Sequence, residues 1–174
     1  GDTGPNTGGM GAYSPAPAMT AEVEARALDE IVRPTMAEMT RRGTPMRGVL
    51  FVGLMIEDGA PSLVEYNVRF GDPECQCLMM RLGGQVLDLL LACAQGRLAE
   101  MRVNWADDHA LCVVMAAKGY PGEYTKGTAI DGLDALPRDS RNMLFHAGTA
   151  MADGHLVANG GRVLGVTARG DTLA

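Results

Sequence analysis

The chain has 174 residues, 47% of them hydrophobic, which is enough for one ordinary domain or two small ones with cores of their own. Its formal net charge of −6, without any basic patch interleaved with aromatic residues, argues against a nucleic-acid partner. The longest strongly apolar stretch, residues 86–93, is far shorter than the roughly 20 residues that a membrane span needs. We therefore expect small-molecule partners, and neither nucleic acid nor membrane.

The four cysteines lack the spacing of a metal site. Cys75 and Cys77 would point in different directions on a helix, so they do not form a ligand pair. Reduced, buried thiols are favoured over a disulfide, as is usual in the cytosol. No secretory signal opens the chain, and we expect a cytoplasmic protein.

The chain opens on a glycine-rich loop, Gly-Pro-Asn-Thr-Gly-Gly-Met-Gly at residues 4–11. Glycine permits positive φ, which lets successive backbone N–H groups converge on an anion. The loop has neither the preceding strand nor the following helix of a dinucleotide-binding motif, and an ordinary turn explains its composition as well. Because such a loop rarely begins a domain, we expect the chain to be a fragment of a longer polypeptide.

A helix and a hairpin follow the loop. Thr20 can cap a helix that begins at the next residue, Gly43 is placed to end it, and Pro34 should kink it because proline lacks a backbone N–H. The nearly continuous apolar run 47–56 predicts a strand buried on both faces. Asp-Gly at residues 58–59 predicts a tight turn into a second strand.

This second strand carries polar side chains where a buried strand would carry hydrophobic ones. Because side chains alternate along a strand, Glu65, Asn67 and Arg69 should project from one face and the hydrophobic residues between them from the other. A carboxylate beside an amide oxygen suits Mg²⁺, which takes one or two carboxylates and completes its shell with water and phosphate oxygens. A guanidinium on the same face adds a bidentate donor for a phosphoryl group. A solvated strand face with an Arg–Glu pair explains the spacing equally well.

A strand-to-helix corner follows at Asp72-Pro73-Glu74. We expect Asp72 as the N-cap, Pro73 at the first helical position and Glu74 near the positive end of the helix dipole. Cap chemistry explains all three residues, although free N–H groups at a helix start also suit a carboxylate or phosphate. The glycine pair 83–84 should end this helix, and residues 86–98 should form another.

After Trp105 the pattern changes to short strands separated by turns. The apolar run 110–117 predicts a strand, and Gly-Tyr-Pro-Gly at 119–122 predicts the turn after it. Asp-Gly at 153–154 and Asn-Gly-Gly at 159–161 predict hairpins among the last strands. Together with the earlier helices, these elements predict an α+β fold with antiparallel sheets.

Five separated segments resemble one family. Glu-x-Asn-x-Arg-Phe-Gly-Asp-Pro-Glu at residues 65–74 resembles the metal-binding strand of ATP-grasp ligases, and is most similar to that of the phosphoribosylamine–glycine ligase family. Residues 1–15, 119–122, 145–148 and 159–164 are similar to further motifs of that family, in the expected order. The resemblance therefore covers nearly the whole chain.

The resemblance implies a domain organisation. Residues 1–100 would be the C-terminal part of the ATP-grasp domain, an antiparallel sheet with helices. Residues 101–174 would be a small, mostly-β C-terminal domain that stops before its last helix. The amine-substrate domain and the rest of the nucleotide-binding surface would belong to a missing N-terminal lobe of the same polypeptide.

The resemblance also implies an activity. It is ATP-dependent ligation of glycine to 5-phosphoribosylamine through glycyl phosphate, with Mg²⁺ or Mn²⁺, in de novo purine biosynthesis. The products are glycinamide ribonucleotide, ADP and phosphate. We expect this fragment alone to be inactive, because most of the nucleotide-binding surface would lie upstream.

Site residues are carried over from the resemblance onto the matching positions. Glu65 and Asn67 would bind the metal, Arg69 would stabilise charge on the phosphoryl group, and Met55 is a candidate contact for the adenine. The strand at residues 51–56 carries no acid, although related enzymes usually place a metal ligand there. Six further residues are candidates for the substrate pocket: Asn6, Thr7, Gly8, Gly9, Asp72 and Pro73.

Two other interpretations stay open. One is another ATP-grasp carboxylate–amine ligase, such as a biotin-carboxylase-like or purine-pathway relative, which the loop at 6–10 and the turn at 119–122 disfavour. The other is a non-catalytic module of a multifunctional purine enzyme. The sequence leaves open the oligomeric state and the preference between Mg²⁺ and Mn²⁺.

Overall fold

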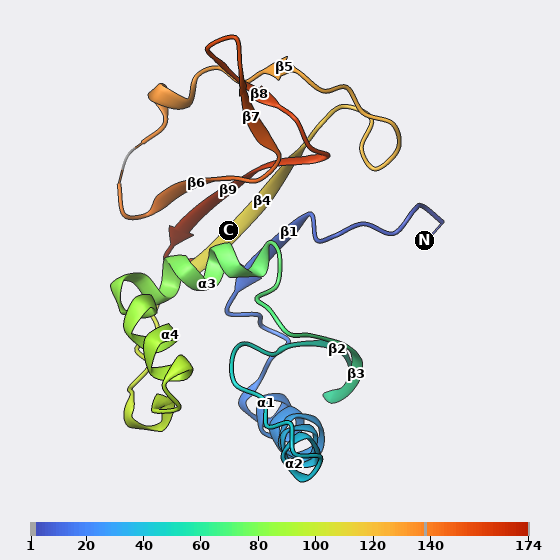
Figure 1. Cartoon of the computed structure of the whole chain (residues 1–174), viewed down its shortest axis with the longest axis vertical. Helices are drawn as coiled ribbons and strands as arrows, with labels where there is room; N and C mark the ends of the chain where they lie inside the picture. The colour runs from blue at the N-terminus through green and yellow to red at the C-terminus, as the bar shows by residue number, and fades with distance from the viewer. Residues whose placement is uncertain (1–2, 138, 174) are drawn as a thin grey trace. The chain divides into compact units, whose positions relative to one another are not determined.

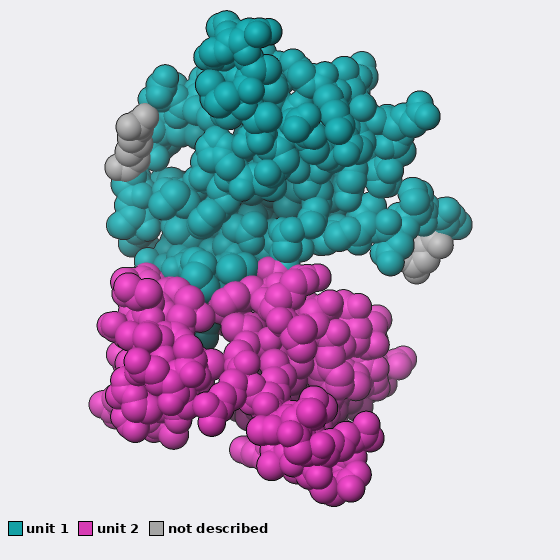
Figure 2. All heavy atoms as spheres, viewed as in Figure 1, with its two compact units in different colours: residues 1–14, 72–81, 105–174 teal, residues 15–71, 82–104 magenta. Residues whose placement is uncertain are grey.

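The computed structural model describes residues 3–137 and 139–173. Contacts divide the chain into two compact units, which Figure 2 shows in two colours. Unit 1 consists of Gly1–Ser14, Asp72–Arg81 and Trp105–Ala174, and unit 2 consists of Pro15–Gly71 and Leu82–Asn104. These units group residues by contact rather than by order in the chain, so the family-domain boundary near residue 100 stays a prediction.

Unit 1 is built on a four-stranded antiparallel sheet of order β1-β4-β9-β6 (Figure 1). Its strands are β1 Gly11–Ser14, β4 His109–Ala116, β6 Asn142–His146 and β9 Arg162–Gly170. The short strand β1 pairs with β4 through Tyr13 and Leu111, which brings the glycine-rich loop to this sheet. The sequence did not predict β1, because four residues are too few to show an alternating pattern.

A second sheet of unit 1 has three strands in the order β5-β8-β7. They are β5 Thr128–Ala129, β7 Thr149–Ala152 and β8 His155–Ala158, and a 3₁₀ turn, Leu133–Ala135, follows β5. The predicted turn between β7 and β8 is confirmed, because Asp153 and Gly154 have φ of 48° and 80°. The predicted hairpin at residues 159–161 is wrong: β8 and β9 belong to different sheets. A Cβ on Gly160 would lie 2.8 Å from the Gly148 Cα, so this glycine permits a close backbone crossing instead.

Helix α3, Glu74–Leu82, packs on one face of the four-stranded sheet. Cys77 and Met80 of this helix are buried with Ala110 and Cys112 of β4. The Cys77 thiol donates to the Ala12 carbonyl at 3.2 Å, and burial raises its pKa to about 11. All four cysteines are free, and Cys77 and Cys112 are buried as predicted, whereas Cys75 and Cys93 are only half-buried.

Unit 2 begins with one helical run. It consists of α1 Ala21–Ala27, a π-helical turn Leu28–Val32 and α2 Arg33–Arg41. Thr20 caps it as predicted, because its hydroxyl accepts from the Val23 N–H at 3.2 Å. The interruption predicted at Pro34 takes the form of the π turn, in which the Arg33 N–H bonds the Leu28 carbonyl.

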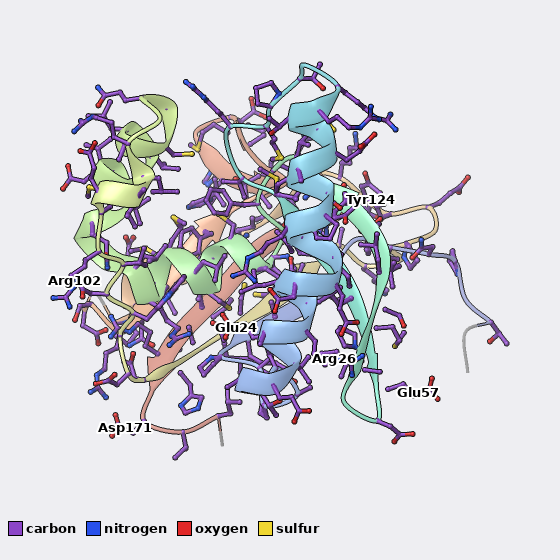
Figure 3. All side chains as sticks on the ribbon, turned by 90° about the horizontal axis from the view of Figure 1, so that it is seen from below. Glu24, Arg26, Glu57, Arg102, Tyr124 and Asp171 are labelled. Carbon is purple, nitrogen blue, oxygen red and sulfur yellow. The ribbon has the colours of Figure 1, made fainter. Side chains whose placement is uncertain are left out.

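The hairpin of unit 2 consists of β2 Phe51–Glu57 and β3 Ala60–Asn67. Its predicted turn is confirmed, with φ of 49° at Asp58 and 75° at Gly59. The prediction of a strand buried on both faces is wrong, because β2 starts only at Phe51 and Met55 is 63% exposed. Arg26 of α1 donates to the Gly59 carbonyl at 3.1 Å, which ties the helix to the turn; Figure 3 labels Arg26.

The helical run Glu74–Ala94 is long and apolar enough, by length and composition alone, to cross a membrane. A 3₁₀ turn, Gly83–Gln85, divides it into α3 and α4, Val86–Ala94, and Gly83 has φ of 59°. The predicted break is thus confirmed, whereas α4 ends four residues before the predicted position. A further 3₁₀ turn, Leu98–Glu100, follows. The buried Cys77 and Met80 in α3 are typical of a helix that packs in a globular core.

Arg169 anchors the end of β9 within unit 1. Its Nε and Nη2 donate to the Asp108 carboxylate at 2.8 to 3.0 Å, and its Nη1 donates to the Met80 carbonyl at 3.1 Å. The Asp108 side chain is only 13% exposed. Hydrogen bonds from the Arg169 guanidinium hold the pKa of Asp108 below its usual value.

Asp108→Asn is expected to lower the free energy of unfolding by about 2 kcal/mol at pH 7, because hydrogen bonds to a charged group are lost. Since the folded-state pKa is lowered, this stabilisation is present above the ordinary aspartate pKa of about 4 and disappears as pH falls through the lower folded value. Urea unfolding at pH 7 and pH 3 measures the change, with Asp107→Asn as the exposed control. An Asp108→Asn deficit of equal size at both pH values would contradict the ionic interpretation.

Candidate functional site

Glu65 and Asn67 lie on β3 as predicted, and their side chains meet. The Asn67 Nδ2 donates to the Glu65 Oε1 at 3.0 Å. Glu65 pairs with Gly53 and Asn67 pairs with Phe51, so both project from one face of the hairpin. A Cβ on Gly53 would lie 3.0 Å from the Glu65 Cγ, so this glycine leaves room for the carboxylate.

Met55 lies on the same hairpin face. It is two residues beyond Gly53 on β2. The register shift between Gly53 and Leu54 leaves its extra residue, Val64, on β3, so alternation along β2 continues and places Gly53 and Met55 on one side. The side chain is 63% exposed, so it forms an apolar surface beside the polar pair. The hairpin therefore presents three of the predicted residues together: Met55, Glu65 and Asn67.

Arg69 does not lie on the strand, contrary to the prediction. β3 ends at Asn67, and the Arg69 Nη1 donates to the carbonyl of its neighbour Phe70 at 2.8 Å. Of the hydrophobic residues expected on the other face, Val64 is 64% and Val68 80% exposed, so these two do not pack as that face should. A register shift that leaves Val64 as an extra residue and the early strand end explain both differences, because each interrupts the alternation of faces along β3.

Tyr66 is the residue between Glu65 and Asn67 that does pack. Its hydroxyl lies 2.5 Å from the Thr35 hydroxyl of α2, and Thr35 in turn donates to the Ile31 carbonyl at 2.8 Å. These bonds attach β3 to the helical run of unit 2. The face opposite Tyr66 is thereby left to Glu65 and Asn67.

The donor set of this hairpin face fits one hard divalent cation. No group of three or more His, Cys, Asp or Glu side chains converges within residues 3–137 and 139–173. Mg²⁺ does not need such a group, because it binds through one or two carboxylates and keeps water and phosphate oxygens as its other ligands. The Glu65 carboxylate and the Asn67 amide oxygen are therefore of the chemical type that such a site takes from the protein.

The other predicted residues lie in unit 1, where Arg162 organises them. At the start of β9, its Nη1 donates to the Gly9 carbonyl at 2.9 Å and the Asp72 carbonyl at 3.1 Å. Its Nη2 donates to the Asp72 Oδ2 at 2.5 Å, and the Arg162 side chain is 23% exposed. One guanidinium thus holds the glycine-rich loop against the Asp72 corner. Sequence reasoning noted the motif at 159–164 but gave Arg162 no role.

Gly8 and Gly9 are required by close packing. A Cβ on Gly8 would lie 2.8 Å from the Arg162 Cζ, and a Cβ on Gly9 would lie 2.6 Å from the Pro73 Cδ. Neither of the two residues has the positive φ that the sequence interpretation invoked. Before them in the loop, Asn6 is exposed and Thr7 is half-buried.

Asp72 and Pro73 do not make the predicted helix start. Helix α3 begins at Glu74, so Pro73 precedes it, and the Asp72–Pro73 peptide bond is cis. The Asp72 carboxylate accepts from Arg162 instead of capping the helix. The prediction was wrong because a partner ninety residues away in the sequence competes for this carboxylate.

A cavity of about 390 Å³ adjoins the Asp72–Arg162 pair within unit 1. Gln76 and the aromatic residues Tyr120 and Tyr124 also line it. The two tyrosine rings meet edge to face, with centroids 6.2 Å apart and an interplanar angle of 63°. This size is within the usual range of small-molecule sites, and charged, amide and aromatic groups together suit a polar ligand.

Two family models match the chain. Residues 1–75 match the phosphoribosylglycinamide synthetase ATP-grasp (A) domain, and residues 110–174 match the phosphoribosylglycinamide synthetase C domain. The chain is 56% identical over 174 residues to the phosphoribosylamine–glycine ligase of Brucella melitensis, covering 100% of this chain and 41% of that protein. It is 60% identical over 174 residues to that of Rhizobium meliloti, covering 99% and 40%. The chain therefore spans about two fifths of the length of these relatives.

Solved structures agree with the predicted fold class. The crystal structure of phosphoribosylamine–glycine ligase from Thermotoga maritima matches 99% of this chain and 42% of that chain, with a TM-score of 0.82 and 37% identity. An L-amino acid ligase from Bacillus licheniformis shares the fold, with a TM-score of 0.59 at 17% identity over 98% of this chain and 41% of that chain. The α+β, ATP-grasp-type fold is thus confirmed.

Gly9→Ala is expected to displace the loop, because the added methyl group would lie 2.6 Å from the Pro73 Cδ and 3.1 Å from the Asp72 carbonyl oxygen. Such overpacking costs about 1–3 kcal/mol, so the thermal midpoint should fall by several degrees. Calorimetry measures it, and Gly4→Ala is the matched control because nothing lies within 4 Å of a Cβ there. Equal midpoints in the two variants would show that the loop does not pack on the corner.

Proposed function

Because the chain belongs to the phosphoribosylglycinamide synthetase family, we propose that it forms part of an ATP-dependent ligase that joins glycine to 5-phosphoribosylamine. The products are glycinamide ribonucleotide, ADP and phosphate, in de novo purine biosynthesis. Since the chain spans 41% of its Brucella relative, the longer enzyme supplies the remaining lobe. We place the enzyme in the cytoplasm.

The observation that carries the proposal is the exposed hairpin face that Glu65 shares with Asn67, in a segment that matches the ATP-grasp (A) domain. Phosphoryl transfer depends on positioning and on neutralisation of charge more than on a protein nucleophile. A carboxylate, an amide and the guanidinium two residues later supply those functions. The reaction needs no activated serine or cysteine.

The reaction has two balanced steps. A glycine carboxylate oxygen attacks the γ-phosphorus of ATP, the bond from this phosphorus to the bridging oxygen breaks, and ADP leaves. The amine nitrogen of 5-phosphoribosylamine then attacks the carbonyl carbon of glycyl phosphate, phosphate leaves with the electrons of the C–O bond, and the nitrogen loses a proton. Negative charge builds up on phosphate oxygens in both steps, and stabilising it is the main demand on the protein.

Glu65 and Asn67 are the residues that would hold Mg²⁺ or Mn²⁺, which when bound neutralises charge on the phosphates. We assign Arg69 to the transferring phosphoryl group. Its guanidinium carries five N–H donors, and its Nη1 already donates to the Phe70 carbonyl, which restrains the side chain. Met55 is our candidate for the adenine contact, because it is exposed and apolar on the Glu65 face.

The loop pocket of unit 1, formed by residues 6–9, Asp72, Pro73 and the adjoining cavity, is our candidate for substrate binding. Arg162 acts there as a positioning residue, since it bonds both Gly9 and Asp72. Any displacement of this guanidinium would release the loop and the corner together. Substrate contacts would then be lost without loss of the metal ligands.

The test is glycine-dependent ADP formation with freshly generated 5-phosphoribosylamine, in an enzyme of full family length that carries this chain. Turnover that requires both substrates supports the ligase. Turnover with other carboxylates or amines but not with these would favour another ATP-grasp ligase. No turnover with any of them would favour a non-catalytic module.

Glu65→Gln in the full-length enzyme is expected to shift the Mg²⁺ dependence to higher concentration and to lower turnover by at least tenfold, because it weakens a charged metal ligand. The fold should persist, since Glu65 is exposed. Turnover against Mg²⁺ concentration is the measurement. Glu57→Gln is the matched control, an exposed glutamate at the end of the neighbouring strand that Figure 3 labels. Normal Mg²⁺ dependence in Glu65→Gln would show that the metal binds at other residues.

Arg69→Lys separates a phosphoryl clamp from a surface residue. Lysine keeps the charge but loses the planar fork, and the loss of a transition-state contact of about 3 kcal/mol lowers the rate about a hundredfold. A surface role would contribute only about 0–1 kcal/mol to stability and nothing to turnover. We expect a large fall in turnover number with an unchanged thermal midpoint. Arg102→Lys, at an exposed arginine, serves as the control. An unchanged turnover number in Arg69→Lys would show that Arg69 has only a structural role.

A further inference from the structure

Gln76 has an unusual environment in unit 1. It lies on α3 and lines the cavity beside Asp72 and Arg162. Its Oε1 is buried and has no hydrogen-bond partner among the described residues. Buried polar atoms are nearly always paired, and an unpaired one destabilises the fold. A ligand that donates a hydrogen bond to the Gln76 Oε1 would remove this cost.

The groups around this oxygen indicate what kind of ligand would donate the hydrogen bond. Asp72 offers a carboxylate that is half exposed, with one oxygen bonded to Arg162. Arg162 uses three N–H groups for Gly9 and Asp72, which leaves two of its five donors for a ligand. Tyr120 and Tyr124 add aromatic walls with hydroxyl groups. Acceptors, a cation and aromatic walls together suit a hydroxyl- or amine-rich molecule with one anionic group.

Size and charge separate the three substrates of the proposed reaction. The cavity of about 390 Å³ is larger than glycine requires. The Asp72 carboxylate disfavours a triphosphate, because like charges repel at short range. A phosphorylated amino sugar fits both the size and the mixed donor and acceptor groups.

We infer that Gln76 is a specificity-determining residue for the amine substrate, and that its Oε1 accepts a hydrogen bond from an amine or hydroxyl of the phosphorylated sugar. This inference rests on the proposed function. The competing role is purely structural, since a Cβ on Gly165 would lie 3.7 Å from the Gln76 Nε2 and the side chain fills space there.

Two variants in the full-length enzyme distinguish these roles. Gln76→Met keeps the length and removes the acceptor, whereas Gln76→Glu keeps an acceptor oxygen. We expect Gln76→Met to raise the KM for 5-phosphoribosylamine about tenfold, which corresponds to about 1.4 kcal/mol. The KM values for ATP and glycine, and kcat, should stay within about twofold. Gln76→Glu should keep the KM for the amine substrate within about threefold of wild type.

Ribose 5-phosphate serves as a stable probe for the same pocket. Its inhibition constant against the amine substrate should rise in parallel with KM in Gln76→Met and remain near wild type in Gln76→Glu. Gln95→Met, at an exposed glutamine of unit 2, is the matched control and should change none of these constants. If Gln76→Met fails to fold, Gln76→Ala removes the acceptor without adding bulk, and the same rise is expected.

Three results would overturn the inference. They are an unchanged KM for the amine substrate in an acceptor-free variant, an equal rise in the KM values of all three substrates, and an equal loss in Gln76→Met and Gln76→Glu. The last result would show a structural or donor role. A wild-type enzyme without glycine- and amine-dependent turnover would instead refute the proposed function, so the two failures are distinguishable.

Discussion

The bonds of the Arg162 guanidinium are the constraint on which the loop pocket depends. They join Gly9 and Asp72 to the start of β9. Arg162 lies 153 residues after Gly9 and 90 residues after Asp72 in the sequence. Bringing such distant segments together costs loop entropy, and charge-assisted hydrogen bonds to two carbonyls and a carboxylate offset part of that cost. Glycine occupies positions 8 and 9 because a side chain at Gly8 or Gly9 would overlap Arg162 or Pro73. The loop is thus shaped by one side chain rather than by its own backbone preferences.

The sequence predicted those features that depend on neighbours in the chain. The Thr20 cap and the turn at residues 58–59 follow from local hydrogen bonding and from residues that tolerate positive φ, and both were found. The shared face of Glu65 and Asn67 was equally local, since only one residue separates them on the strand. Arg69 was misplaced because nothing local reveals where a ladder ends or shifts register.

Long-range pairing accounts for the predictions that failed. The change of sheet between β8 and β9 could not be seen, because Asn-Gly-Gly is typical of a hairpin whether or not the next strand pairs with the last. The Asp72 carboxylate was assigned to the helix start for the same reason: its partner Arg162 is distant in sequence. Positive φ was the wrong reason for Gly8 and Gly9, since a close approach by another segment leaves no pattern in the loop itself.

The polar groups of Asp108, Glu65 and Gln76 fall into two classes: those whose hydrogen bonds are filled within the fold, and those that keep hydrogen-bonding capacity. Asp108 has its hydrogen bonds filled by Arg169, and such a group stabilises the fold but has little capacity left for a ligand. Glu65 is exposed with a single bond from Asn67, and Gln76 keeps a buried acceptor unpaired. Evolution tolerates an unsatisfied group where its partner arrives from outside, because the free energy lost in the empty fold is returned on binding. Glu65 and Gln76 therefore keep hydrogen-bonding capacity for a ligand, whereas Asp108 does not.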